Sequence, residues 1–113
     1  MPTIYKICRA GDWKAADAEG VYRGSEVDRR DGFVHFSTAA QVGETARRHF
    51  KGEHDLVLVA FDEARLRHRV RYEAARDGAL FPHLYGPLDP AMALWVKPLP
   101  LDANGIHIFP ELT

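Results

Sequence analysis

DGFVHFSTAAQ, residues 31–41, predicts a turn, a short strand and the start of a helix. Asp-Gly is typical of a turn, because glycine tolerates positive φ and the Asp side chain bonds the backbone two residues further on. Side chains alternate along the strand that follows, so Val34 and Phe36 lie on one face. Phe33, His35 and Ser37 lie on the opposite face. Two polar groups therefore project together from one side of this strand.

A helix is expected to begin directly after this strand. Thr38, followed three residues later by Gln41, fits a capping box and predicts a helix from Thr38 to about Phe50. A helix start leaves backbone N–H groups without partners and favours anions. His35, Ser37 and Thr38 are therefore candidate site residues, with the imidazole as donor or general base near neutral pH. The alternative is a strand histidine bonded to a neighbour, beside an ordinary capping box.

Length and composition predict one globular domain over residues 1–113. Hydrophobic residues make up 46% of the chain and charged residues 27%, as in ordinary globular proteins. The formal net charge of -1 argues against bulk electrostatic attraction to nucleic acid or to an anionic membrane, although a local basic patch is compatible with it. No apolar run approaches the roughly 20 residues that span a bilayer, and the N-terminus has no signal-peptide pattern, so we expect a cytoplasmic protein.

The remaining elements predict an α+β fold. Alternating or apolar runs predict strands over residues 3–8, 55–62, 69–74 and 92–99. The run 55–62 (DLVLVAFD) is apolar on both faces and is expected to be a central strand. A short helix should run from Asp12 to Gly20, and residues 21–30 should form a loop in which Ser25 caps a single turn. Asp89-Pro90 predicts a turn or short helix, and residues 105–109 alternate behind a hairpin-type Asn104-Gly105 turn.

Further candidate site residues lie in the second half of the chain. If residues 81–87 (FPHLYGP) are extended, His83 and Tyr85 face the same way, and stacking with hydroxyl donation suits a nucleobase or a similar planar ligand. The alternative is an aromatic loop packed between prolines. Glu73 has arginines nearby in the sequence and is either a catalytic or ligand-holding carboxylate or a member of a surface ion pair.

Metal and nucleophile chemistry have weaker support. Three imidazoles, from His35, His83 and His107, are chemically able to hold zinc. They lack the tight local spacing of such sites, so no metal is predicted. The lone Cys8 excludes an intrachain disulfide, and no G-x-S-x-G pattern surrounds Ser37.

Several of these segments together resemble the bacterial family called domain of unknown function 952. The segments that carry the likeness are IYKI (4–7), the helix with Trp13, DGFVHFSTAAQ (31–41), DLVLVAFD (55–62), VRYE (70–73) and FPHLYGPL (81–88). The likeness spans nearly the whole chain. Proteins of this family resemble the ADP-ribosyltransferase fold, and the order of elements here is similar to its RNA 2′-phosphotransferase branch.

The resemblance implies a small, split, twisted, mainly antiparallel sheet with two main helices, and a cleft that binds NAD in the active members. The cleft would be lined by the first strand, the His35 strand and a later strand. Active members place His or Arg on the first strand, where this chain has Lys6, a point charge able to contact phosphate. Many members carry a catalytic Glu on a late strand, for which Glu73 is the nearest candidate.

Two functions are compatible with these patterns. The first is binding of a nucleotide-like or other small anionic ligand in a cleft formed by His35 and His83. The second is an ADP-ribosyl- or 2′-phosphotransferase-type enzyme that uses NAD. Lys6 in place of His or Arg favours binding. The expected catalytic residues are His35, Glu73 and His83, and the expected ligand contacts are Lys6, Ser37, Thr38 and Tyr85.

Overall fold

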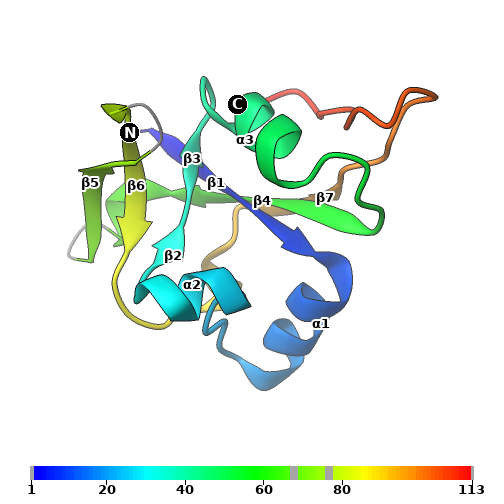
Figure 1. Ribbon diagram of the computed structural model, residues 1–113. Coiled ribbons are helices and arrows are strands. Elements are labelled where there is room, and N and C mark those ends of the chain that lie inside the picture. The colour runs from blue at the N-terminus through cyan, green and yellow to red at the C-terminus, as the bar shows by residue number, and fades with distance from the viewer. Residues whose placement is uncertain (1, 67–68, 76–77, 113) are drawn as a thin grey trace.

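Seven strands and four α-helices make up the computed structural model, which describes residues 2–66, 69–75 and 78–112 (Figure 1). The strands are β1 (Thr3–Arg9), β2 (Val34–His35), β3 (Ser37–Thr38), β4 (Leu56–Asp62), β5 (Val70–Ala74), β6 (Leu80–Leu84) and β7 (Trp95–Pro98). The helices are α1 (Ala10–Glu19), α2 (Glu26–Asp31), α3 (Val42–His49) and α4 (Glu63–Leu66), with a 3₁₀ helix over Pro90–Met92. The α+β class is thereby confirmed.

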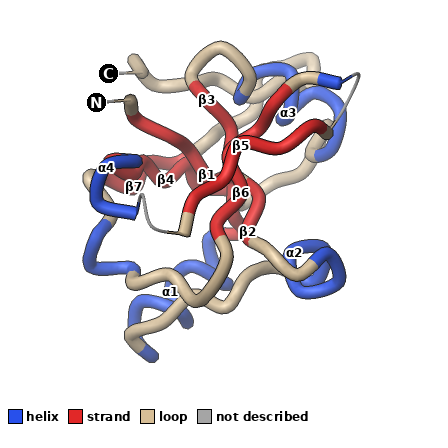
Figure 2. The backbone as a smooth tube through the Cα atoms, turned by 90° about the vertical axis from the view of Figure 1, so that its left-hand side faces the viewer, coloured by secondary structure: helices blue, strands red, loops and turns tan. Residues whose placement is uncertain are grey.

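The strands form two antiparallel sheets, of order β3-β1-β4-β7 and β2-β6-β5. A single segment joins them, as Figure 2 shows where β2 and β3 meet the other strands. In β2, His35 pairs with His83 of β6, whereas in β3, Ser37 pairs with Tyr5 of β1. Between the two, the Phe36 N–H donates to the carbonyl of Pro82 at 3.0 Å. The predicted strand thus changes partners halfway and ties the sheets together.

The larger sheet is covered on both faces, and β4 lies between β1 and β7 as the predicted central strand. On one face, Ile4 and Cys8 of β1 pack with Trp13 of α1. On the other face, apolar residues of β1 pack with Val42 and Ala46 of α3. Alternation along β1 therefore places Lys6 on the face that α1 covers, between two core residues.

The loop predicted over residues 21–30 is wrong, because α2 begins at Glu26. Ser25 does cap it: its hydroxyl accepts from the Asp28 N–H, and the Asp28 carboxylate accepts from the Ser25 N–H, which completes a capping box. The only residue that this helix buries is charged, Asp28. A helix without an apolar face gives no periodic signal, which is why the sequence pattern missed it.

The two predicted helix starts are also displaced. The first helix begins at Ala10, with Asp12 inside its first turn, and ends as predicted at Gly20, whose φ is 87°. The later helix begins at Val42 because Thr38 is held extended by its pairing with Ile4 of β1. Only half of the expected capping box forms, in which the Thr38 N–H donates to Gln41 Oε1 at 3.1 Å.

The C-terminal part of the chain is less regular than its alternation indicates. Asp89 caps the 3₁₀ helix as expected, so β7 begins at Trp95 instead of residue 92. Residues 105–109 do not form a strand; a single bridge joins Leu101 to His107. Within the described ranges, no helix has the length and apolar character needed to cross a bilayer.

Candidate functional site

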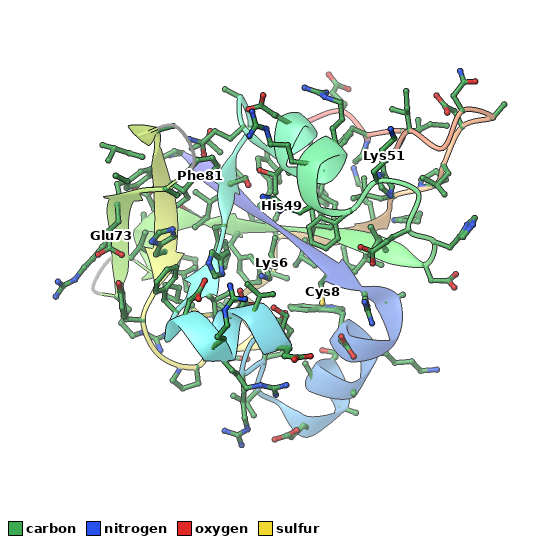
Figure 3. All side chains as sticks on the ribbon, viewed as in Figure 1. Lys6, Cys8, His49, Lys51, Glu73 and Phe81 are labelled. Atoms are coloured by element: carbon green, nitrogen blue, oxygen red, sulfur yellow. The ribbon has the colours of Figure 1, made fainter. Side chains whose placement is uncertain are left out.

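A cleft of about 1160 Å³ is lined by residues of β1, α1, α2, β6, α3 and the segment that joins the sheets. His35, His83, Lys6 and Ser37 are among its lining residues. Figure 3 shows Lys6, His49 and Phe81 around this part of the molecule and Glu73 at the outer edge of the smaller sheet. The predicted residues that do not line the cleft are Glu73, Thr38 and Tyr85.

His35 lies between two carboxylates of α2. Its Nδ1 is 2.6 Å from Asp28 Oδ1, and its Nε2 is 3.0 Å from Asp31 Oδ2. The pKa of Asp31 lies below its usual range, chiefly because Arg30 donates a hydrogen bond to it. An ionised carboxylate only accepts hydrogen bonds, so each ring nitrogen of His35 faces an acceptor. The imidazole is therefore held from both sides by carboxylates of α2.

Asp28 organises this side of the site, although the periodicity of the sequence did not predict a buried acid at this position. Its side chain is 2% exposed and accepts from Lys6 Nζ at 2.8 and 3.1 Å, from the Ser25 N–H at 2.9 Å and from the His35 N–H at 3.1 Å. Burial acts to raise the pKa of Asp28, but the hydrogen bond from His35 and the charge of Lys6 lower it far below its ordinary 3.8. Asp28 is therefore ionised at neutral pH.

Lys6 is a partner of Asp28 and not a free cation. Its side chain is 6% exposed, and its ammonium contacts both carboxylate oxygens of Asp28. Its charge is therefore neutralised inside the protein. Lys6 lines the cleft, as expected of a ligand contact, and it also links β1 to Asp28, which in turn contacts His35.

His83 lies beside His35 on the neighbouring strand, and the two ring centroids are 5.5 Å apart at an interplanar angle of 68°. His83 Nδ1 is 2.9 Å from Glu73 Oε1, and the Tyr85 hydroxyl donates to the same oxygen at 2.6 Å. These bonds, first that of Tyr85 and then that of His83, lower the pKa of Glu73. Glu73 and Tyr85, although outside the cleft lining, thus hold one of the imidazoles that line it.

Phe33 packs against both imidazoles. Its ring is stacked on His83 at a centroid distance of 4.0 Å and an angle of 22°, and it lies 4.6 Å from the ring of His35. Strand alternation placed Phe33 on the face of His35, which was the available signal, but it could not show the contact with β6. Phe33 restricts the movement of both rings.

Two hydroxyls meet on the α3 side of the cleft. Ser37 Oγ is 3.0 Å from Thr45 Oγ1, and Thr45 Oγ1 is 3.2 Å from the carbonyl of Gln41. A hydroxyl has one proton, so Thr45 donates to the carbonyl and Ser37 donates to Thr45. The Ser37 hydroxyl therefore donates its proton to Thr45 and not to His35, so this bond does not activate Ser37 as a nucleophile.

The third histidine of the zinc alternative lies elsewhere. His107 Nε2 is 2.9 Å from the carbonyl of Glu53, and His107 does not line the cleft. Across residues 2–66, 69–75 and 78–112, no group of three or more His, Cys, Asp or Glu side chains is arranged to hold a metal ion. The structure thus brings two of the three imidazoles together.

Comparison with known proteins gives a family and solved structures. The family model described as "Protein of unknown function (DUF952)" matches residues 7–96. The crystal structure of CC0527 from Caulobacter crescentus is 43% identical over 94% of this chain and 93% of that chain, with a TM-score of 0.90. The solution NMR structure of CC0527 is 44% identical over 94% and 91%, with a TM-score of 0.85. No curated protein matches.

Proposed function

The chain belongs to the DUF952 family of proteins of unknown function, and on that premise we propose that it binds a nucleotide-like or other small anionic ligand in the cleft lined by His35 and His83. One observation carries the proposal: two imidazoles lie side by side in the cleft, each fixed at Nδ1 by a carboxylate. Such fixed imidazoles present their remaining nitrogens to a ligand with little loss of side-chain freedom.

The contact between His35 and Asp31 supports an anionic ligand. Asp31 places a carboxylate oxygen 3.0 Å from His35 Nε2, and this side chain is 31% exposed. A phosphate oxygen is able to take the same place and accept a charge-assisted hydrogen bond. The carboxylate of Asp31 would then be exchanged for the phosphate of the ligand.

The size of the cleft and the charge at its edge support a nucleotide. The cleft measures about 1160 Å³, above the roughly 300 to 1,000 Å³ of pockets for drug-sized ligands, so a nucleotide has room within it. Arg29 lines the cleft and is exposed, and the described part of the chain gives it no ion-pair partner. A guanidinium of this kind binds phosphate in bidentate fashion.

The alternative is an ADP-ribosyl- or 2′-phosphotransferase-type enzyme that uses NAD. It rests on the resemblance of two antiparallel sheets joined by one segment to the split sheet of the ADP-ribosyltransferase fold. Lys6 does not fit the NAD contact of the first strand, because Asp28 already binds its ammonium. We therefore derive no step through NAD and favour ligand binding.

A thermal-shift series tests the proposal, with AMP, ADP, ADP-ribose, NAD and inorganic phosphate as probes. A ligand at about 100 times its Kd stabilises the fold by about 2.7 kcal/mol, which raises the Tm by several degrees. We expect at least one nucleotide to raise the Tm of the wild type, and His35→Ala to abolish that increase. His54→Ala is the matched control, since His54 is exposed and does not line this cleft.

Two results would contradict ligand binding at this site. In the first, none of the probes changes the Tm of the wild type. In the second, the increase persists undiminished in His35→Ala. Release of nicotinamide from NAD by the wild type would instead support the transferase alternative.

A further inference from the structure

We propose that the cleft catalyses acid–base cleavage of a nucleotide phosphodiester, with His83 as general base and His35 as general acid. The inference rests on the proposed function, because the nucleotide must first bind. It goes beyond binding by assigning different proton states to the two imidazoles. Those states follow from the hydrogen bonds that each ring makes.

His83 has the bonding of a base. Glu73 is an ionised acceptor at Nδ1, so Nδ1 carries a proton, and in the neutral ring the lone pair is on Nε2. Within the described ranges, no residue bonds Nε2, and no buried polar side-chain atom lacks a partner. It follows that Nε2 of His83 keeps accessible surface although the side chain is 5% exposed, and His83 is among the residues that line the cleft.

His35 has the bonding of an acid. Its two nitrogens donate to Asp28 and Asp31, so the ring carries a proton on each. Asp28 is buried and fixed by Lys6, whereas Asp31 is partly exposed at the last position of α2. When phosphate displaces Asp31, the Nε2–H of His35 faces the ligand and Asp28 still holds Nδ1.

The strand register brings the two rings to one ligand group. His35 and His83 are directly opposed residues of neighbouring antiparallel strands, so their side chains lie on the same face. Their centroids are 5.5 Å apart. A base and an acid at this spacing reach oxygens on the same phosphorus within hydrogen-bond distance.

Hydrolysis of a 2′,3′-cyclic phosphate illustrates the step. Water attacks phosphorus, and its proton passes to Nε2 of His83 as the new P–O bond forms. The bond from phosphorus to one ribose oxygen breaks, and that oxygen receives the proton from Nε2 of His35. One water is consumed, a phosphomonoester is formed, and solvent exchange returns a proton to His35 and removes one from His83.

The experiment is turnover of 2′,3′-cyclic AMP to adenosine monophosphate, followed by chromatography. General acid–base catalysis contributes about 10² to 10⁴ in rate, so we expect His35→Gln and His83→Gln each to lower kcat by at least about 100-fold. Because the residues act in one step, the double variant should lose little more than either single variant. His54→Gln, purified in the same way, should retain the wild-type rate.

Glu73→Gln is a second test of the base that keeps the His83 ring in place, and it serves if His83→Gln does not fold. A Gln amide no longer imposes the Nδ1–H form, as for the orienting carboxylate of a catalytic triad. We expect kcat to fall while KM stays near the wild-type value. A fall in kcat together with a rise in KM would instead indicate a collapsed cleft and would overturn the positioning role.

Binding of AMP, measured by calorimetry, separates this inference from the proposed function. Binding without turnover of the cyclic nucleotide overturns the catalytic inference and leaves ligand binding intact. Absence of both overturns both. Turnover that is equal in wild type, His35→Gln and His83→Gln also overturns the inference, because the imidazoles would then have no part in it.

Discussion

The two carboxylate–imidazole pairs of the cleft have opposite burial. In the first pair, the Asp28 carboxylate is 2% exposed and the His35 side chain is 34% exposed. In the second, the Glu73 carboxylate is 39% exposed and the His83 side chain is 5% exposed. The Nδ1-to-oxygen distances are similar, 2.6 and 2.9 Å. The carboxylate is therefore the buried partner in the first pair, and the imidazole is the buried partner in the second.

Because of this difference in burial, we expect the two carboxylates to have different roles, one in the stability of the fold and one in the orientation of an imidazole. A buried carboxylate must have its charge and lone pairs satisfied, so Asp28 is tied to β1 through Lys6 and to the start of α2 through Ser25. Glu73 is 39% exposed, and among the described residues its carboxylate accepts hydrogen bonds from the side chains of His83 and Tyr85. We therefore expect changes at Asp28 to affect folding, and changes at Glu73 to affect mainly the proton on His83.

The largest expected effect follows from removing the buried carboxylate. Asp28→Ala leaves the Lys6 ammonium buried without a counter-charge, and breaking such a pair from one side costs about 3–5 kcal/mol. We expect a loss of that size in the free energy of unfolding, measured by urea denaturation. A complete failure to fold would agree with it.

Asp31→Ala is the matched control for this prediction, because Asp31 bonds the other nitrogen of the same imidazole from an exposed position. Its free energy of unfolding should stay close to that of the wild type. If Asp31→Ala were as destabilising as Asp28→Ala, burial of the carboxylate would not explain the difference between the pairs.

The pH dependence of stability is a second, smaller effect of the same carboxylate. The folded pKa of Asp28 lies below its ordinary 3.8, so its contribution is complete above that value and is lost as the pH falls toward the folded pKa. We expect the stability advantage of the wild type over Asp28→Asn to be present at about pH 5. It should decrease below about pH 4.

Urea titrations of both proteins at pH 3, 4, 5 and 7 measure this advantage. Other carboxylates titrate in both proteins, so the comparison isolates the substituted side chain. An advantage that is independent of pH would contradict an ionised, stabilising Asp28.

The sequence predicted the strand that carries His35 better than the helix that carries Asp28. Alternation placed His35 and Ser37 opposite Val34 and Phe36, and the latter two do belong to one core cluster that excludes the former two. It missed Asp28, because a helix that buries only an acid has no apolar stripe. The signal that existed was Ser25 followed three residues later by Asp28, a capping box in which Asp stands for Glu.

Long-range pairing was beyond the reach of local patterns. The opposition of His35 and His83 depends on the register between β2 and β6, which are distant in the chain. Their common cleft followed only from the family resemblance. The same limit explains the helix start expected at Thr38, because the pairing of Thr38 with β1 is a tertiary contact that overrides a local cap.

Phe33 links the two pairs, so its truncation should affect both. Phe33 is half-buried and contacts the rings of His35 and His83. Full burial of a Phe makes its replacement by Ala cost about 3–5 kcal/mol, so we expect about 1–2 kcal/mol for this half-buried ring. Urea denaturation measures the loss, and Phe33→Leu, which keeps apolar contact but not stacking, should lose less. Equal losses in both variants would show that the apolar contact kept by Leu contributes nothing, which would contradict this expectation.

The smallest expected effect on stability belongs to Glu73→Gln. Because the Glu73 side chain is well exposed, its charge is hydrated in both folded and unfolded chains, and the free energy of unfolding should change little. The proton on His83 should nevertheless move, since a Gln amide no longer requires Nδ1–H as its donor. Long-range ¹H–¹⁵N spectra of the imidazoles report this directly, with His35 in the same sample as the internal reference. If the Nδ1–H form of His83 survived the substitution, the exposed carboxylate would not be what sets that proton, and the two pairs would differ in stability alone.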